Sequence, residues 1–95
     1  MNINLDNEQL QIFNDIILHD LELTMETLNI NIQRAEWDYA VWALDRIDTC
    51  FAVLESLGAQ LSVYYEDMDE LIQDCPSDVI YRSKIFDRYD GSEIG

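Results

Sequence analysis

Carboxylates are the side chains of this sequence whose number and spacing could do chemistry, because it holds 20 Asp and Glu against 5 Lys and Arg. Glu66, Glu70 and Asp74 follow one another at steps of four residues, and Asp67 and Asp69 lie between them. In a helix such steps place side chains along one side. Rows of this kind could bind a divalent cation, supply the acid pair of a glycosidase, or meet a basic surface on another protein.

Further acids lie earlier in the chain at helical spacing. Like charges four residues apart each destabilise a helix by about 0.2–0.5 kcal/mol, and solvated helix faces ordinarily mix Lys with Glu. A single Lys in 95 residues therefore indicates selection against positive charge. The alternative is that the acids are solvated faces that serve only solubility. The acids with this spacing are Glu8, Asp15, Glu22 and Glu26, followed by Asp38, Asp45, Asp48 and Glu55.

The side chains that most active sites and metal centres need are scarce. His19 is the only histidine, and Cys50 and Cys75 are separated by 25 residues without a Cys-x-x-Cys motif. A zinc site takes several Cys or His ligands at short spacing, and a nucleophile takes a neighbouring base. We therefore predict no catalytic residue, no metal site, no cofactor and no enzymatic activity, and we interpret both cysteines as free thiols.

The net charge of −15 narrows the class of partner. Direct binding to nucleic acid or to an anionic membrane needs Lys and Arg, so a basic protein surface is the expected complement. No segment reaches the roughly 20 apolar residues of a membrane span, and the first residues lack the basic and apolar regions of a signal peptide. We expect a cytoplasmic protein, located in the host cytoplasm if a phage encodes it.

Helices are the elements that must position these acids. Asp6 and Gln9 have the spacing of a capping box, and Gly58 and Pro76 are helix stops. The predicted helices cover 7–32, 36–57, 62–74 and 78–88, with a frayed tail over 90–95. The inward stripe of the first is Leu10, Phe13, Ile17, Leu21, Met25 (or Thr24), Leu28 and Ile32, widened by Ile12, Ile16 and Leu23. The inward seam of the second is Trp37, Ala40, Leu44, Ile47, Phe51 and Leu54.

Two stretches leave alternatives open. Residues 29–36 contain neither Gly nor Pro, so the first two helices could form one continuous rod. Residues 79–86 would also fit a strand. With only three Gly and one Pro, the chain does not have the turns of an all-β fold. We predict one all-α domain over residues 1–95, a compact three- to four-helix bundle, which would form a homodimer if the seam of the second helix were not filled within one chain.

Aromatic side chains add a second type of binding surface. Trp37 and Trp42 lie five residues apart, so they face different ways in a helix. If Trp37 joins the core, Trp42 and Tyr39 face outward, where aromatics beside acids are typical of protein-binding hot spots. The alternative is that a later helix covers Trp42.

In composition the chain resembles the DNA-mimic proteins of phages and mobile elements, including some anti-restriction and anti-CRISPR proteins. Helical turns about 5.4 Å apart can space carboxylates much as a DNA strand spaces phosphates. The resemblance implies a non-catalytic inhibitor that occupies the basic groove of a nucleic-acid-binding protein. The alternative is a helical interaction or assembly module that binds through apolar and aromatic faces. The expected partner-binding residues are Glu66, Asp67, Asp69, Glu70, Asp74, Asp38, Asp45, Asp15, Glu22, Glu26, Trp42 and Tyr39.

Overall fold

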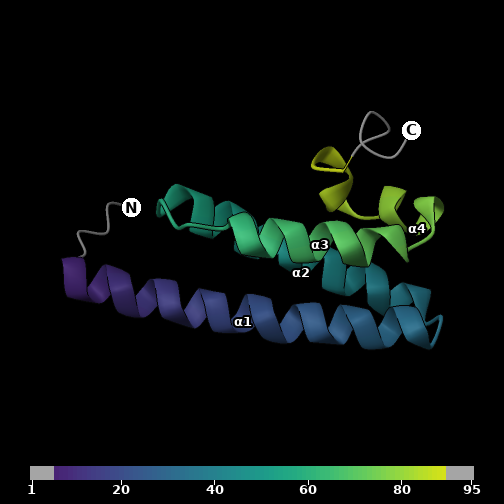
Figure 1. Cartoon of the computed structure of the whole chain (residues 1–95), viewed down its shortest axis with the longest axis horizontal. Helices are drawn as coiled ribbons and strands as arrows, with labels where there is room; N and C mark the ends of the chain where they lie inside the picture. Colours follow the sequence, from purple (N-terminus) through teal and green to yellow (C-terminus); the bar gives the residue numbers. More distant parts are fainter. Residues whose placement is uncertain (1–5, 90–95) are drawn as a thin grey trace.

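The computed structural model describes residues 6–89, so the tail predicted over 90–95 lies outside the described residues. The elements are α1 (Asn7–Gln33), α2 (Trp37–Ser56), α3 (Ser62–Gln73), α4 (Ser77–Tyr81) and a 3-10 helix, η1 (Lys84–Asp87). No strand is present in the described range (Figure 1). The all-α helical-bundle prediction is confirmed, and residues 79–86 do not form a strand.

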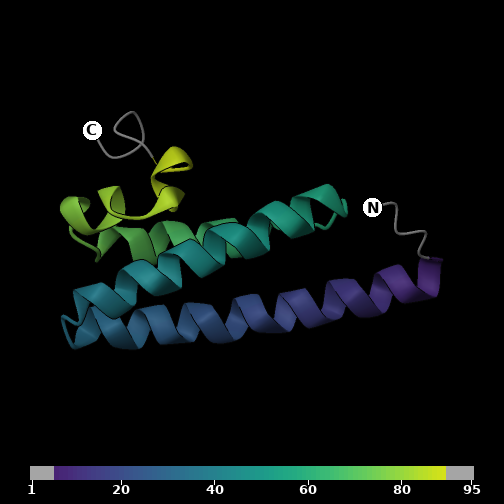
Figure 2. The same ribbon diagram turned by 180° about the vertical axis from the view of Figure 1, so that it is seen from behind.

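The helices form an elongated bundle of 42 × 27 × 26 Å. α1 and α2 are an antiparallel hairpin, and α3 runs in the same direction as α1, beside both (Figure 1). α4 and η1 pack on α2, away from α1 (Figure 2). The purple N-terminal turns of α1 extend past the end of α2 (Figure 2). α1 is thus the longest element, and its first turns are not covered by α2.

The start of α1 follows from its capping box. The Asp6 carboxylate accepts the backbone N–H of Gln9 at 2.8 Å, and the Gln9 side chain accepts the backbone N–H of Asp6 at 3.1 Å. Farther along, the side chains of α1 that are buried are Leu21, Thr24, Met25, Leu28 and Asn31. No described residue of α1 before Leu21 is buried. The inward stripe that we predicted is therefore buried only in the second half of the helix.

The core is built around α2. Ala40, Leu44, Ile47, Phe51 and Leu54 are fully buried, as the seam predicts, and Trp37 is half-buried. This seam is filled within one chain, so the condition that we set for a homodimer through it is not met. The remaining elements contribute Leu61, Met68, Ile72, Cys75, Val79, Ile80 and Ile85.

Both cysteines are free and buried in this core. Burial raises the pKa of Cys50, and it raises the pKa of Cys75 to about 11. A thiol with a raised pKa stays protonated near neutral pH and is a poor nucleophile. The structure therefore agrees with the interpretation of both cysteines as free thiols, and it places them in the core.

α1 and α2 are separated by a turn at Ala35, so the single-rod alternative is wrong. The backbone N–H of Glu36 donates to the carbonyl of Asn31 at 2.9 Å, and that of Ala35 donates to Ile32 at 3.1 Å. This is the Schellman arrangement, which needs a positive φ at the residue after the C-cap. Ala35 has φ +54°. α2 ends in the same way at Gly58, with φ +75°.

These two turns make a matched pair for a stability test. A left-handed conformation costs a non-glycine residue about 1–2 kcal/mol, whereas Gly adopts it freely. We expect Ala35→Gly to raise the free energy of unfolding by about 0.5–1 kcal/mol and Gly58→Ala to lower it by about 1 kcal/mol. A Cβ at Gly58 would meet no atom within 4 Å, so the loss reports the backbone alone. Urea unfolding followed by circular dichroism measures both, and a destabilised Ala35→Gly variant would contradict the argument.

The helix predicted over 78–88 is interrupted at Ser83, and this is a correction. Ser83 has extended backbone angles, φ −103° and ψ 148°. Its hydroxyl donates to an Asp45 carboxylate oxygen at 2.7 Å and accepts the N–H of Ile85 at 3.1 Å. The same Asp45 oxygen accepts the backbone N–H of Lys84 at 3.0 Å. These bonds replace helical hydrogen bonds, so α4 ends at Tyr81 and η1 starts afresh.

Candidate functional site

The basic residues of the C-terminal segment, Arg82, Lys84 and Arg88, contact side chains of α2. Arg82 pairs with Asp38 at 2.6 Å. The Lys84 ammonium donates to the Thr49 hydroxyl at 2.6 Å, beside the Asp45 contacts described above. Asp38 and Asp45, which we predicted to bind a partner, are therefore engaged by the chain's own C-terminal segment. We leave both out of the candidate site.

Arg88 is the centre of the strongest of these ionic contacts. It donates to Asp48 at 2.5 Å and, through two nitrogens, to both carboxylate oxygens of Glu55 at 2.8 and 2.9 Å. The Tyr65 hydroxyl also donates to Glu55, at 2.6 Å. Hydrogen bonds from Arg88 hold the pKa of Glu55 below its ordinary value. Two acids of α2 are thus neutralised, and the C-terminal segment is attached to α2.

Replacing Arg88 by Met is expected to lower the free energy of unfolding at neutral pH by about 1–2 kcal/mol, because Asp48 and Glu55 lose their shared donor. The folded-state pKa of Glu55 is lowered, so its contribution is complete above the ordinary pKa of Glu, about 4.3, and is lost as the pH falls through the folded value. The difference between wild type and variant should therefore shrink between about pH 7 and about pH 3. Urea unfolding at both pH values measures it, and a pH-independent difference would speak against the ionic origin.

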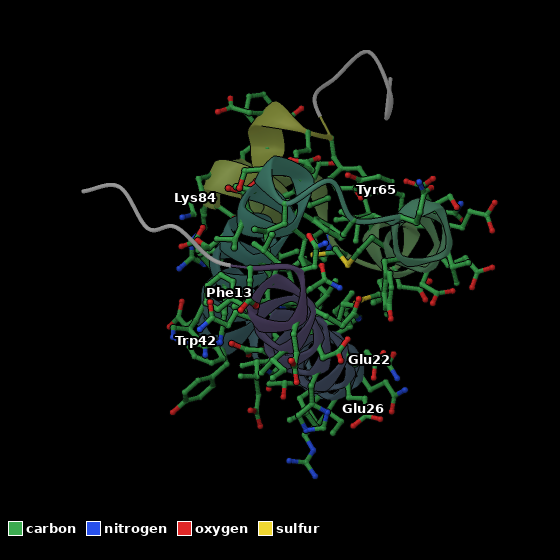
Figure 3. All side chains as sticks on the ribbon, turned by 90° about the vertical axis from the view of Figure 1, so that its left-hand side faces the viewer. Phe13, Glu22, Glu26, Trp42, Tyr65 and Lys84 are labelled. Atoms are coloured by element: carbon green, nitrogen blue, oxygen red, sulfur yellow. The ribbon has the colours of Figure 1, made fainter. Side chains whose placement is uncertain are left out.

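The acids of α1 and α3 are arranged differently. A groove of about 450 Å³ runs between these two helices, and we call it the acidic groove. Among the residues that line it there is no Lys, Arg or His. Figure 3 shows Glu22 and Glu26 together on this side of the molecule. The lining consists of Glu22, Met25, Glu26 and Asn29 from α1, Tyr64, Asp67, Glu70 and Leu71 from α3, and Asp74 directly after it.

Apolar side chains line part of the groove, and a hydrogen bond connects its two helices. Among its lining residues, Met25 is buried and Leu71 is half-buried. The Tyr64 hydroxyl donates to Glu22 at 2.7 Å, which joins the two walls and raises the pKa of Tyr64. Of the described residues, no group of three or more His, Cys, Asp or Glu could hold a metal ion. The carboxylates that line the groove come from both of its helices and from Asp74 after α3.

The structure brings five of the predicted acids together and separates the others. Glu22, Glu26, Asp67, Glu70 and Asp74 line the groove. The remaining three acids that we predicted, apart from Asp38 and Asp45, are Asp15, Glu66 and Asp69. Asp15 lies two turns earlier on α1 and accepts the Gln11 amide at 3.0 Å.

Glu66 and Asp69 do not line the groove. Asp69 lies on the other side of α3, near Tyr65 and Arg88. The predicted row of Glu66, Glu70 and Asp74 therefore gives way to Asp67, Glu70 and Asp74, at steps of three and four residues. Steps of three and four together follow one face of a helix more closely than steps of four alone.

Trp42 and Tyr39 of α2 are exposed. Their exposed fractions are 54 % and 65 %, so no helix of the described chain covers Trp42. The Arg46 guanidinium lies 5.8 Å from the Trp42 ring centroid and pairs with Asp20 of α1 at 2.7 Å. Figure 3 shows Trp42 and Phe13 on one side and Glu22 and Glu26 on the other.

Sequence reasoning missed one group of exposed residues. The large apolar side chains of α1 that are exposed are Ile12, Phe13, Ile16, Leu23 and Ile30. We had assigned the first four to the inward stripe. Their recurrence at steps of four and seven residues on a second line of the helix is the signal that could have separated them from the core.

Comparisons with protein-family models, with curated proteins and with solved structures find no match to this chain. None of the helices described between residues 6 and 89 has the length and apolar character needed to cross a membrane. The function therefore has to be argued from the charges and the exposed side chains themselves.

Proposed function

We propose that this chain is a non-catalytic, protein-binding inhibitor whose acidic groove occupies a basic, nucleic-acid-binding surface of another protein. The observation that carries the proposal is the segregation of charge. On α2 the acids Asp38, Asp48 and Glu55 are paired with the chain's own Arg residues. Within the described residues, the acids of the groove take part in none of the ion pairs. The chain has five basic residues, and four of them make their contacts away from the groove. These four are Arg46, Arg82, Lys84 and Arg88.

Unpaired like charges work against folding, so their retention on one face favours a role for the field that they create. The groove holds carboxylates on two rigid helices that run in the same direction (Figure 1). Successive turns repeat about every 5.4 Å, which gives two roughly parallel lines of negative charge. Lys and Arg that normally contact phosphates would meet carboxylates there, and the field would also speed association. An inhibitor of the anti-restriction or anti-CRISPR type, encoded by a phage or mobile element, fits this arrangement.

Affinity capture from a bacterial lysate with the full chain as bait, followed by identification of the bound protein, tests the proposal. We expect a nucleic-acid-binding protein whose dissociation constant rises at least about tenfold between about 50 and about 200 mM salt. Duplex DNA or guide RNA should compete for the same surface. Capture of a partner whose binding changes neither with salt nor with added nucleic acid would overturn it.

A second candidate function rests on the other side of the molecule. Exposed Tyr39 and Trp42 are residues typical of hot spots, and they favour a helical interaction module that binds through apolar contacts. For such a module, Trp42→Ala would abolish partner binding and salt would have little effect. The two candidates therefore predict opposite outcomes in the same capture experiment.

A further inference from the structure

Four apolar side chains of α1 lie on one line of the helix, outside the core. They are between 46 % and 59 % exposed, so none of the helices described between residues 6 and 89 buries them. At 3.6 residues per turn, a step of four residues turns the helix surface by about 40°, and a step of seven turns it back by about 20°. Steps of four, seven and seven therefore keep all four side chains within about 40° of one another. We call this set the outer line, and its members are Ile12, Ile16, Leu23 and Ile30.

The outer line faces away from the core. Leu21 and Leu28 are fully buried and also lie seven residues apart, so they form the inner line of the same helix. Leu23 follows Leu21 by two residues, which is a rotation of about 200° around the helix axis. A helix with two apolar lines packs on its own chain with one of them and can pack on another helix with the other. Within the described range the outer line has no such neighbour.

The acidic groove borders the outer line directly. Glu26 lines the groove, and it lies three residues after Leu23 and four before Ile30. Residues three and four apart are neighbours on a helix surface, so the Glu26 carboxylate lies beside both apolar side chains. Figure 3 shows Glu26 next to Glu22, the other glutamate of the same wall. The apolar line and the carboxylates of α1 thus form adjoining parts of one surface.

The charge on the opposite flank of the outer line is compensated. Asp20 lies four residues after Ile16 and three before Leu23. The Arg46 guanidinium donates to both of its carboxylate oxygens, at 2.7 and 2.9 Å. Glu26, in contrast, takes part in none of the ion pairs of residues 6–89. Uncompensated negative charge therefore borders the outer line on the side of the groove.

This surface selects its occupant by charge and by shape. A second copy of the chain, with a net charge of −15, is repelled, and so are nucleic acids and anionic membranes. Apolar side chains that repeat every seven residues favour a helix as the occupant, because helices pack along such lines at a shallow angle. A helix with Lys or Arg on the line next to its apolar line complements both parts of the surface.

We infer that the outer line and the acidic groove together bind a basic amphipathic helix of the partner. Its apolar side chains pack on Leu23 and Ile30, and its Lys or Arg side chains extend past Glu26 into the groove. Such side chains have long aliphatic stems that can lie on apolar surface while the charged end reaches a carboxylate. Ile12 and Ile30 are 18 residues apart, so the outer line is roughly 27 Å long, enough for about five turns of a partner helix. The inference rests on the proposed function, since it specifies the part of the partner that the groove binds.

Two synthetic peptides of about 18 residues, made of Leu, Lys and Ala in the same proportions, are the probes. The segregated peptide has Leu on one helical line and Lys on the next, and the scrambled peptide has the same residues without this order. We expect the full chain to bind the segregated peptide at least about tenfold more tightly, because only this peptide can contact both parts of the surface at once. Titration calorimetry measures both dissociation constants.

Leu23→Gln with Ile30→Gln should raise the dissociation constant of the segregated peptide at least about tenfold and change that of the scrambled peptide by less than about twofold. Gln favours helix and both sites are about half exposed, so the circular dichroism should not change. Tyr81→Gln is the matched control and should alter neither constant. Tyr81 is 54 % exposed and belongs to α4, which packs on α2 away from α1 (Figure 2).

Asp67→Lys with Glu70→Lys separates this inference from the proposed function. It should weaken the binding of both peptides and reduce the salt dependence, because both peptides carry Lys. Equal affinity for the two peptides, or no binding of either, would overturn the inference. So would a wild-type chain that sediments as a dimer and dissociates on Leu23→Gln with Ile30→Gln, since a second copy would then cover the outer line. If the peptides behave as expected but nucleic acid does not compete with the captured partner, the proposed function fails and the helix-binding surface stands.

Discussion

Reversing the three groove acids of α3, by Asp67→Lys, Glu70→Lys and Asp74→Lys, is expected to abolish partner binding while the protein becomes more stable. These acids form one wall of the groove, and no basic residue lines it. Against a basic partner each reversal replaces an attraction by a repulsion, so the dissociation constant should rise at least about a thousandfold, or about 4 kcal/mol. Repulsion within the folded chain falls at the same time. We expect the melting temperature to rise by about 2–5 °C.

A control with the same change in charge separates the groove from the total charge. Glu8→Lys, Glu66→Lys and Asp69→Lys place three positive charges on the same two helices but outside the groove lining. Since only long-range attraction is reduced, binding should weaken by less than about tenfold at physiological salt. Titration calorimetry with the captured partner measures both variants. Equal losses would mean that the field as a whole, and not the groove, attracts the partner.

The fold follows largely from local signals in the sequence. Asp6 and Gln9 cap α1, Gly58 ends α2, and Pro76 separates α3 from α4, each through backbone chemistry within a few residues. Ala35 carries no such signal, because nothing in its type favours a positive φ. The break at Ser83 depends on Asp45, 38 residues earlier in the chain. A contact over that separation leaves no local pattern, so a continuous helix was the natural prediction.

The sequence predicts which residue types form the candidate site, but it does not predict how they are arranged in space. Helical spacing identifies rows of acids, and five of the ten predicted acids do line one groove. Which acids remain unpaired depends on where Arg82 and Arg88 come to lie after folding, and they lie on α2. The exposed apolar side chains of α1 were missed for a similar reason, because the spacing of apolar residues does not show which of them the other helices cover.

Phe51→Ala is expected to have the largest effect on stability of any single change. Phe51 is fully buried in α2, its ring lies 5.0 Å from the Tyr65 ring of α3, and the Arg88 guanidinium lies 5.5 Å from its centroid. Truncation should lower the free energy of unfolding by about 3–5 kcal/mol. A small domain has about 5–10 kcal/mol in all, so the variant should be largely unfolded in low urea. It removes a contact that α2, α3 and the C-terminal segment share.

Phe13→Ala is the control for this loss, since it deletes the same side chain from a site that is 41 % exposed. It should lower the free energy of unfolding by less than about 1 kcal/mol, because the ring already contacts solvent in the folded chain. Urea unfolding followed by circular dichroism measures both variants. Equal losses for Phe13→Ala and Phe51→Ala would contradict the argument that burial of the ring sets the size of the effect.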